Sequence, residues 1–259
     1  MTAVLEVSDV SVRFGGVAAL AGVSFAVAPG GITSLIGPNG AGKTTAFNVV
    51  TGFQRPTAGE IRHEGTAITG WRPDRIALRG LVRTFQKTSV FPALTVTENV
   101  VTGLHLAGRV GLGAALFRRG RVREEERLLA EEARRLVDFV GLSGRAGELA
   151  TALPYGEQRL VELAVALGAR PRLLLLDEPA SGMTAGEKVR VADLVRRVCA
   201  EGVTVFLVEH DMRLVMGISD RVLVLDHGRL IADGAADEVR RDPGVIRAYL
   251  GTGAADAER

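Results

Sequence analysis

The stretch GPNGAGKTT at residues 37–45 decides the fold of this chain. Its first eight residues match the pattern G-x-x-x-x-G-K-[ST] at every fixed position. The preceding residues 32–36 read ITSLI, a short apolar run that predicts a β-strand. Residues 46–50 have helical character, and Gly52 ends that run. A strand, a glycine loop and a helix in this order predict a phosphate-binding loop.

This loop carries the groups that hold a nucleotide. Its glycines let successive backbone N–H groups turn onto phosphate oxygens, and the helix directs its positive dipole end at the same anion. Lys43 would place a charge on the β- and γ-phosphates, and the Thr44 hydroxyl would bind Mg²⁺. A chance glycine-rich turn is the alternative, and the flanking strand and helix argue against it. The predicted contacts are Gly37, Pro38, Asn39, Gly40, Ala41, Gly42, Lys43, Thr44 and Thr45.

A second part of the predicted site follows a run of leucines. Residues 173–176 are all leucine, and Asp177 and Glu178 come directly after them. Ligands of open α/β sheets bind at the carboxyl ends of the strands. We therefore expect Asp177 to hold Mg²⁺ and Glu178 to orient or deprotonate an attacking water. Without the phosphate loop, this acidic pair would be read as a solvated turn.

Three further residues and one turn are weak signals when each is taken alone. Gln86 can reach a metal or a water, but a lone glutamine is ordinarily a surface residue. His210 ends an apolar run and can contact a γ-phosphate, but a lone histidine is usually structural. Phe14 can stack on adenine, but such an aromatic residue more often belongs to the core. Residues 153–157 precede a helix, whose amino end can face an anion.

Composition excludes several classes of protein. The chain has 259 residues, of which 47% are hydrophobic, so it can bury a substantial core. Its net charge of +2 and its 5% aromatic content argue against nucleic-acid binding. Cys199 is the single cysteine, so no internal disulfide forms, which fits a reducing cytoplasm. Apolar runs are far shorter than the roughly 20 residues that span a bilayer, so we expect any membrane role to depend on partners.

Apolar strands that alternate with helices predict an α/β fold with a mainly parallel sheet covered on both faces. Alternating residues at 4–14 and 23–27 predict strands, which we expect to form an amino-terminal antiparallel β subdomain. The Leu- and Arg-rich run at 121–140 predicts an inserted helical subdomain. We expect one domain, with its core at 1–91 and 160–251 and the helical subdomain at 92–159. Residues 252–259 are small and polar and predict a disordered tail.

Together these motifs resemble those of the ATP-binding subunits of ABC transporters, over nearly the whole chain. Residues 37–45 resemble the Walker A loop, 153–158 the signature motif and 173–178 the Walker B motif with its catalytic glutamate. Phe14, Gln86 and His210 match the adenine-stacking aromatic, the glutamine loop and the switch histidine. Segments 85–99, 178–182, 209–221 and 245–251 resemble the subgroup that serves branched-chain amino-acid uptake.

The resemblance implies a P-loop NTPase (RecA-like) core that binds ATP and Mg²⁺. It implies catalytic roles for Glu178, His210 and Gln86, and metal ligation by Thr44, Gln86 and Asp177. The resemblance adds Phe14 to the predicted nucleotide contacts, as the aromatic residue that stacks on adenine. In this family the signature turn completes the site of a facing subunit, so the predicted contacts also include Tyr155, Gly156 and Glu157.

The partners implied by the resemblance are membrane permease subunits, which would dock near residues 86–99, and a second ATP-binding subunit. We expect that second subunit to be non-identical, with a homodimer as the alternative. A substrate-binding protein takes part indirectly, and no nucleic acid does. The chain is expected at the cytoplasmic face of the membrane, as a peripheral protein.

Two residues depart from the family pattern. Pro154 stands where the signature motif usually has a serine, which removes one hydroxyl contact to the γ-phosphate. A hydrogen bond to a charged group is worth about 1.5–3 kcal/mol, so this change is expected to weaken ATP-driven closure without abolishing it. Thr184 stands where an aspartate is common, in the loop that communicates with the facing subunit.

Three other functions compete with this interpretation. A soluble ABC ATPase acting on ribosomes or DNA usually has two ATPase halves or a long coiled coil, and this chain has one phosphate loop and no heptad array. The ATPase subunit of a urea or lipopolysaccharide transporter is an alternative that the sequence does not exclude, because the cargo never touches this subunit. A regulatory module without catalysis is disfavoured by Asp177, Glu178 and His210, and Pro154 is its only support.

Overall fold

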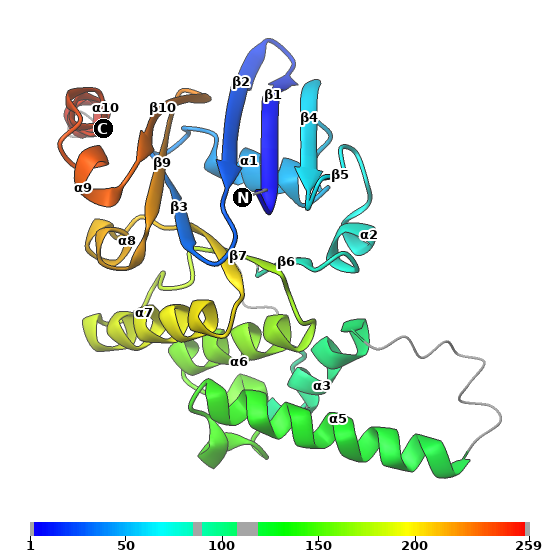
Figure 1. The fold of residues 1–259 in the computed structure, drawn as a ribbon. Coiled ribbons are helices and arrows are strands. Elements are labelled where there is room, and N and C mark those ends of the chain that lie inside the picture. The colour runs from blue at the N-terminus through cyan, green and yellow to red at the C-terminus, as the bar shows by residue number, and fades with distance from the viewer. Residues whose placement is uncertain (1–2, 85–89, 108–118, 257–259) are drawn as a thin grey trace.

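The computed structural model describes residues 3–84, 90–107 and 119–256 (Figure 1). Two sheets occupy the upper part of the view, and a group of helices lies below them. Within the described residues, no helix combines the length and the apolar character that crossing a membrane requires.

The central sheet has six strands in the order β10-β9-β3-β8-β7-β6. β3 pairs in parallel with β8 and β9, and β7 pairs in parallel with β6 and β8, while β10 runs antiparallel to β9. The mainly parallel α/β sheet predicted from the sequence is therefore confirmed. The strands are β3 (Ile32–Ile36), β6 (Leu81–Arg83), β7 (Leu173–Asp177), β8 (Thr204–Val208), β9 (Arg221–Asp226) and β10 (Arg229–Gly234).

The leucines of β7 show why this sheet is buried on both faces. Successive side chains of a strand point to opposite faces. Leu174 and Leu176 pack in the core shared with the helical layer, whereas Leu173 and Leu175 pack in the core shared with α1 (Lys43–Val50). All four are fully or almost fully buried. The strand therefore ends in the protein interior and brings Asp177 to the carboxyl edge of the sheet.

The second sheet has four antiparallel strands in the order β2-β1-β4-β5, which confirms the predicted amino-terminal β subdomain. Its apolar face packs on the same core as α1 and one face of the central sheet. The strands are β1 (Leu5–Phe14), β2 (Val17–Val27), β4 (Ala58–His63) and β5 (Thr66–Ala67), and the short helix α2 (Pro73–Ala77) follows them.

The other face of the central sheet is covered by helices (Figure 1). α3 (Val96–Ala107), α5 (Arg119–Phe139) and α6 (Tyr155–Gly168) pack on one another, with the short 3₁₀ turns η1 (Ser143–Arg145) and η2 (Ala150–Ala152) between α5 and α6. The predicted boundary at residues 159 and 160 falls inside α6. Since α6 is one continuous helix, we propose that the helical subdomain extends to Gly168.

The remaining helices flank the later strands. α7 (Ala185–Ala200) joins β7 to β8, and α8 (Met212–Ile218) joins β8 to β9. α9 (Ala236–Val239) and α10 (Pro243–Asp256) follow β10 and form a third small core with Ile36 and β9. The predicted disordered tail differs from the structure over residues 252–256, because α10 continues through them. Residues 257–259 lie outside the described residues.

Candidate nucleotide-binding site

The phosphate-loop residues connect β3 to α1, as the sequence predicts. Gly37 has φ 151°, and a Cβ there would lie 2.0 Å from the carbonyl oxygen of Leu225. Gly42 has φ 103°, and its Cβ would lie 2.5 Å from the carbonyl oxygen of Ala19. Neighbouring strands thus approach the loop so closely that only glycine fits at these two positions.

Lys43 lies buried inside this loop. Its Nζ donates hydrogen bonds to the carbonyl oxygens of Gly37 at 2.7 Å and Pro38 at 2.9 Å. Burial lowers the pKa of Lys43, and the charges of Glu178 and Asp177 partly offset that effect. The loop carbonyls therefore hold the ammonium group close to the two carboxylates at the end of β7.

The loop, Glu178 and His210 share one cavity of about 240 Å³. Residues far apart in the sequence meet here because β3, β7 and β8 end at the same edge of the sheet. The cavity is lined by Ala19, Asn39, Gly40, Ala41, Gly42, Lys43, Thr44, Thr45, Glu178 and His210.

Glu178 and His210 are hydrogen-bonded to each other across this cavity. Nε2 of His210 lies 2.6 Å from Oε1 of Glu178, and 13% of the Glu178 side chain is exposed against 46% of the His210 side chain. Glu178 has φ 50°, in the left-handed region that residues other than glycine seldom adopt. Its N–H donates to the carbonyl oxygen of Val208 at 2.8 Å, which fixes this backbone. Non-glycine residues held in this way are concentrated at active sites.

Asp177 is buried and paired with Arg83, a residue that the sequence analysis did not single out. Nη2 of Arg83 lies 2.6 Å from Oδ2 of Asp177, with only 7% and 4% of the two side chains exposed. Nη1 of Arg83 also donates to Oδ1 of Asn48 in α1 at 2.7 Å. Arg83 therefore ties the end of β6 to the end of β7 and to the helix after the phosphate loop.

The oxygen atoms of Thr44 and Asp177 are hard donors, which Mg²⁺ prefers. The Thr44 residue lines the cavity, and the charge of the Asp177 carboxylate opposes the lowering of the Lys43 pKa that burial causes. These residues fit the predicted metal site. Gln86, the third predicted ligand, lies outside the described residues.

The predicted signature residues and Phe14 do not line this cavity. α6 begins at Tyr155 after Pro154, and Tyr155 is 44% exposed. Gly156 and Glu157 lie in the first turn of α6, whose N–H groups have no acceptor within the helix. Phe14 ends β1 with 52% of its surface exposed. Their roles in nucleotide contact stay predictions.

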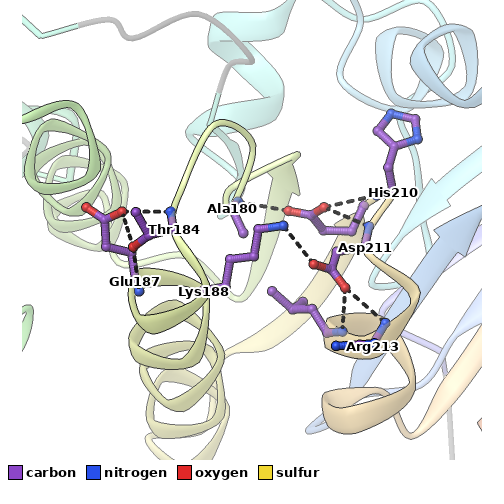
Figure 2. A network of polar contacts seen from close by, with 9 residues as sticks. Ala180, Thr184, Glu187, Lys188, His210, Asp211 and Arg213 are labelled. Atoms are coloured by element: carbon purple, nitrogen blue, oxygen red, sulfur yellow. Dashed lines mark hydrogen bonds and ion pairs between the residues drawn. The ribbon is translucent and has the colours of Figure 1, made fainter.

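Thr184 has a local structural role at the start of α7 (Figure 2). Its Oγ1 accepts a hydrogen bond from the N–H of Glu187, and the Glu187 carboxylate accepts from the N–H of Thr184 at 2.8 Å. This reciprocal arrangement is a capping box. The residue that departs from the family pattern thus begins a stable helix. The Glu187 carboxylate also lies 2.4 Å from where a Cβ of Gly156 would stand, so α7 meets the signature turn.

Tyr249 in α10 contacts Gly37, the first residue of the phosphate loop. Burial raises the pKa of Tyr249 to about 12, and a hydrogen bond between its hydroxyl and the Gly37 backbone partly offsets that effect. The ring packs on the third core, which includes Ile36 at the end of β3. Residues 245–251 resemble the branched-chain subgroup, which is a sequence signal for this segment. The resemblance does not predict that Tyr249 contacts the phosphate loop.

Comparison with known proteins agrees with this geometry. The family model described as ABC transporter matches residues 20–181, and one described as branched-chain amino acid ATP-binding cassette transporter matches residues 229–255. The high-affinity branched-chain amino acid transport ATP-binding protein BraF of Pseudomonas aeruginosa is 43% identical over 96% of this chain and 98% of its own length. The corresponding LivG protein of Escherichia coli K12 is 40% identical over 95% of this chain and 97% of its own.

A solved structure described as the ADP conformation of MJ1267, an ATP-binding cassette of an ABC transporter, superposes with a TM-score of 0.84. It is 32% identical and covers 97% of this chain and 100% of its own. The P-loop NTPase fold and the resemblance drawn from the sequence motifs are therefore confirmed. With a matching family model over more than half of its length and full-length relatives that are 40% and 43% identical, this chain belongs to the ABC transporter family, as one of its ATP-hydrolysing subunits.

Proposed function

We propose that this chain hydrolyses ATP to power the import of branched-chain amino acids. The observation that carries the chemistry is the cavity that Lys43, Thr44, Glu178 and His210 share. The cargo assignment rests on the names of BraF and LivG and on the match of residues 229–255 to the branched-chain family model.

Each group in the cavity has a separate role in this proposal. Lys43 and the loop N–H groups hold the β- and γ-phosphates of ATP. Glu178 accepts a proton from the water that attacks the γ-phosphorus, while the bond from that phosphorus to the bridging oxygen breaks and ADP leaves. His210 orients the Glu178 carboxylate through the 2.6 Å contact between them.

We further propose that Thr44, Asp177 and Gln86 hold Mg²⁺, which neutralises charge on the phosphates when it is bound. Asp177 is kept in place for this role by Arg83. Lys43 would add a fixed positive charge beside the phosphates.

The signature turn is proposed to act on a second ATP-binding subunit. Because Tyr155, Gly156 and Glu157 lie outside the cavity of their own chain, they suit contact with nucleotide held by a facing subunit, and Phe14 suits stacking on adenine. The facing subunit is proposed to be non-identical. Permease subunits would attach near residues 86–99, which places the chain at the cytoplasmic face of the membrane.

Substitution of Glu178 by glutamine tests the proposed chemistry. Glu178→Gln should leave ATP affinity within about twofold and lower turnover by a factor of about 10²–10⁴, the range for loss of a general base. Binding is measured with a fluorescent ATP analogue, and turnover by phosphate release with Mg²⁺ present. Glu201→Gln, an exposed change at the end of α7, is the matched control. Turnover near the wild-type rate in Glu178→Gln would remove Glu178 from its catalytic role.

Co-purification with membrane partners tests the cargo. The recovered complex, reconstituted in vesicles, should accumulate leucine, isoleucine and valine only when ATP is supplied. Recovery of a lipid exporter or a urea permease would refute the cargo assignment and leave the ATPase assignment unaffected.

A further inference from the structure

Glu209 is a buried carboxylate that joins two loops of the site. It follows β8, is 4% exposed, and directly precedes His210. Its Oε1 accepts a hydrogen bond from the N–H of Ala180 at 2.8 Å, and its Oε2 accepts from the N–H of His210 at 2.9 Å (Figure 2). Ala180 lies two residues after Glu178, so one carboxylate holds the loops that carry both members of the Glu178–His210 pair.

A second connection is made by Asp211, the residue that follows His210 (Figure 2). Nζ of Lys188 in α7 donates to Oδ2 of Asp211 at 2.8 Å, while Oδ1 of Asp211 accepts from the N–H groups of Arg213 and Leu214 at the start of α8. The hydrogen bond to Asp211 raises the pKa of Lys188, with a smaller contribution from Glu209. The loop at 209–211 is therefore joined to the loop and helix after Glu178 at two points.

We propose that Glu209 is a positioning residue that, together with the Lys188–Asp211 pair, makes the loop after Glu178 and the loop carrying His210 move as one unit. The inference rests on the proposed roles of Glu178 and His210. Through Glu209, a shift of His210 toward or away from the γ-phosphate is transmitted to the segment 180–184. That segment leads to α7, which meets the signature turn at Gly156. Glu209 thus joins the hydrolytic pair to the surface proposed to face the second subunit.

The chemistry of the carboxylate makes the connection testable. Both oxygens of a carboxylate accept hydrogen bonds, whereas a glutamine amide has one acceptor oxygen and one NH₂ donor. Oε1 accepts from Ala180, and Oε2 accepts from His210 and, at 3.5 Å, from Asp211. Glu209→Gln therefore keeps an acceptor on only one of these two sides and turns a donor toward the N–H on the other. The side-chain volume is almost unchanged, so packing is preserved.

We expect Glu209→Gln to lower kcat for ATP about tenfold while ATP affinity stays within twofold. In single-turnover assays on the full chain, the same change in a His210→Ala background should lower the rate by less than twofold, because Glu209 acts through His210. Asp220→Asn is the matched control, since Oδ2 of Asp220 accepts from the N–H of Ile32 at 2.8 Å and lies at the opposite end of β3. That control should keep kcat within twofold.

Lys188→Met provides a second test if Glu209→Gln does not fold. It removes the connection to Asp211 at a partly exposed position, and we expect about a threefold loss of kcat that also disappears in the His210→Ala background. Wild-type kcat in the folded variant, or an equal loss with and without His210, would refute the inference. If the wild type hydrolyses ATP and His210→Ala slows it, the proposed function is supported whether or not the Glu209 inference holds. Failure of the inference can therefore be told apart from failure of the proposed function.

Discussion

The buried ion pair between Arg83 and Asp177 gives the sharpest prediction about stability. Replacing Arg83 with methionine keeps most of the side-chain volume but removes the positive charge. Asp177 then stays buried, 4% exposed, without the guanidinium that lies 2.6 Å from its Oδ2. The hydrogen bond from Arg83 to Asn48 at 2.7 Å is lost as well.

The expected loss follows from the cost of a buried charge without its partner. Removing one member of a buried ion pair costs about 3–5 kcal/mol, because the remaining ion is poorly solvated. Arg83→Met should therefore lower the free energy of unfolding by about 3–5 kcal/mol at pH 7. The double variant Arg83→Met/Asp177→Asn should recover more than half of that loss, because no unpaired ion remains.

Equilibrium unfolding in urea, followed by circular dichroism, measures this difference. Arg172→Met is the matched control, because Arg172 pairs with Glu64 at 2.5 Å with 67% and 29% of the side chains exposed. Exposed pairs are worth about 0–1 kcal/mol, so this control should shift the midpoint little. An Arg83→Met loss below about 1 kcal/mol, or a double variant no more stable than the single one, would refute the reasoning.

Three further predictions concern the surroundings of the site. Gly37→Ala should lower the free energy of unfolding in urea by about 3 kcal/mol, because its Cβ would stand 2.0 Å from a carbonyl oxygen of β9. Gly15→Ala is the control and should cost only about 1 kcal/mol, since its Cβ would have no atom within 4 Å. Equal losses for the two variants would contradict this prediction. Tyr249→Phe removes the hydroxyl that bonds to the Gly37 backbone and should cost about 0.5–1.5 kcal/mol in the same assay; unchanged stability would show that this bond contributes nothing. The Lys188 hydrogen bond lowers the pKa of Asp211 below its ordinary 3.8, so the stability that Asp211 contributes is complete above that value and disappears as pH falls through its lowered pKa. Asp211→Asn should therefore be less stable than wild type at pH 7, by a difference that shrinks as pH falls below 3.8, and a pH-independent difference would contradict the assignment.

The phosphate loop could be predicted because its chemistry is local. The glycines, Lys43 and Thr44 are contiguous, and the strand before them and the helix after them fix the loop geometry. Asp177 and Glu178 are likewise adjacent to a strand whose leucines identify it as buried. Where one short segment carries both the fold and the chemistry, the residue pattern is sufficient.

The supporting residues could not be predicted because their partners are distant in the sequence. Arg83 lies 94 residues before Asp177, and Glu209 holds Ala180 from 29 residues away. Tyr249 reaches Gly37 from the last helix. These contacts depend on the strand order of the sheet, which hydrophobic patterns do not specify. The expected disorder after residue 251 differs from the structure for a similar reason, since small polar residues do not exclude a helix that continues from a packed segment.

Binding and hydrolysis of ATP by the wild type and by Lys43→Ala test the central claim most directly. With Mg²⁺ and its partner subunits supplied, the wild type should bind ATP and release phosphate, and Lys43→Ala should bind ATP at least about tenfold more weakly, because the ammonium held in the loop is gone. A wild-type chain that neither binds nor cleaves ATP under these conditions, or a Lys43→Ala variant with unchanged ATP affinity, would contradict the account.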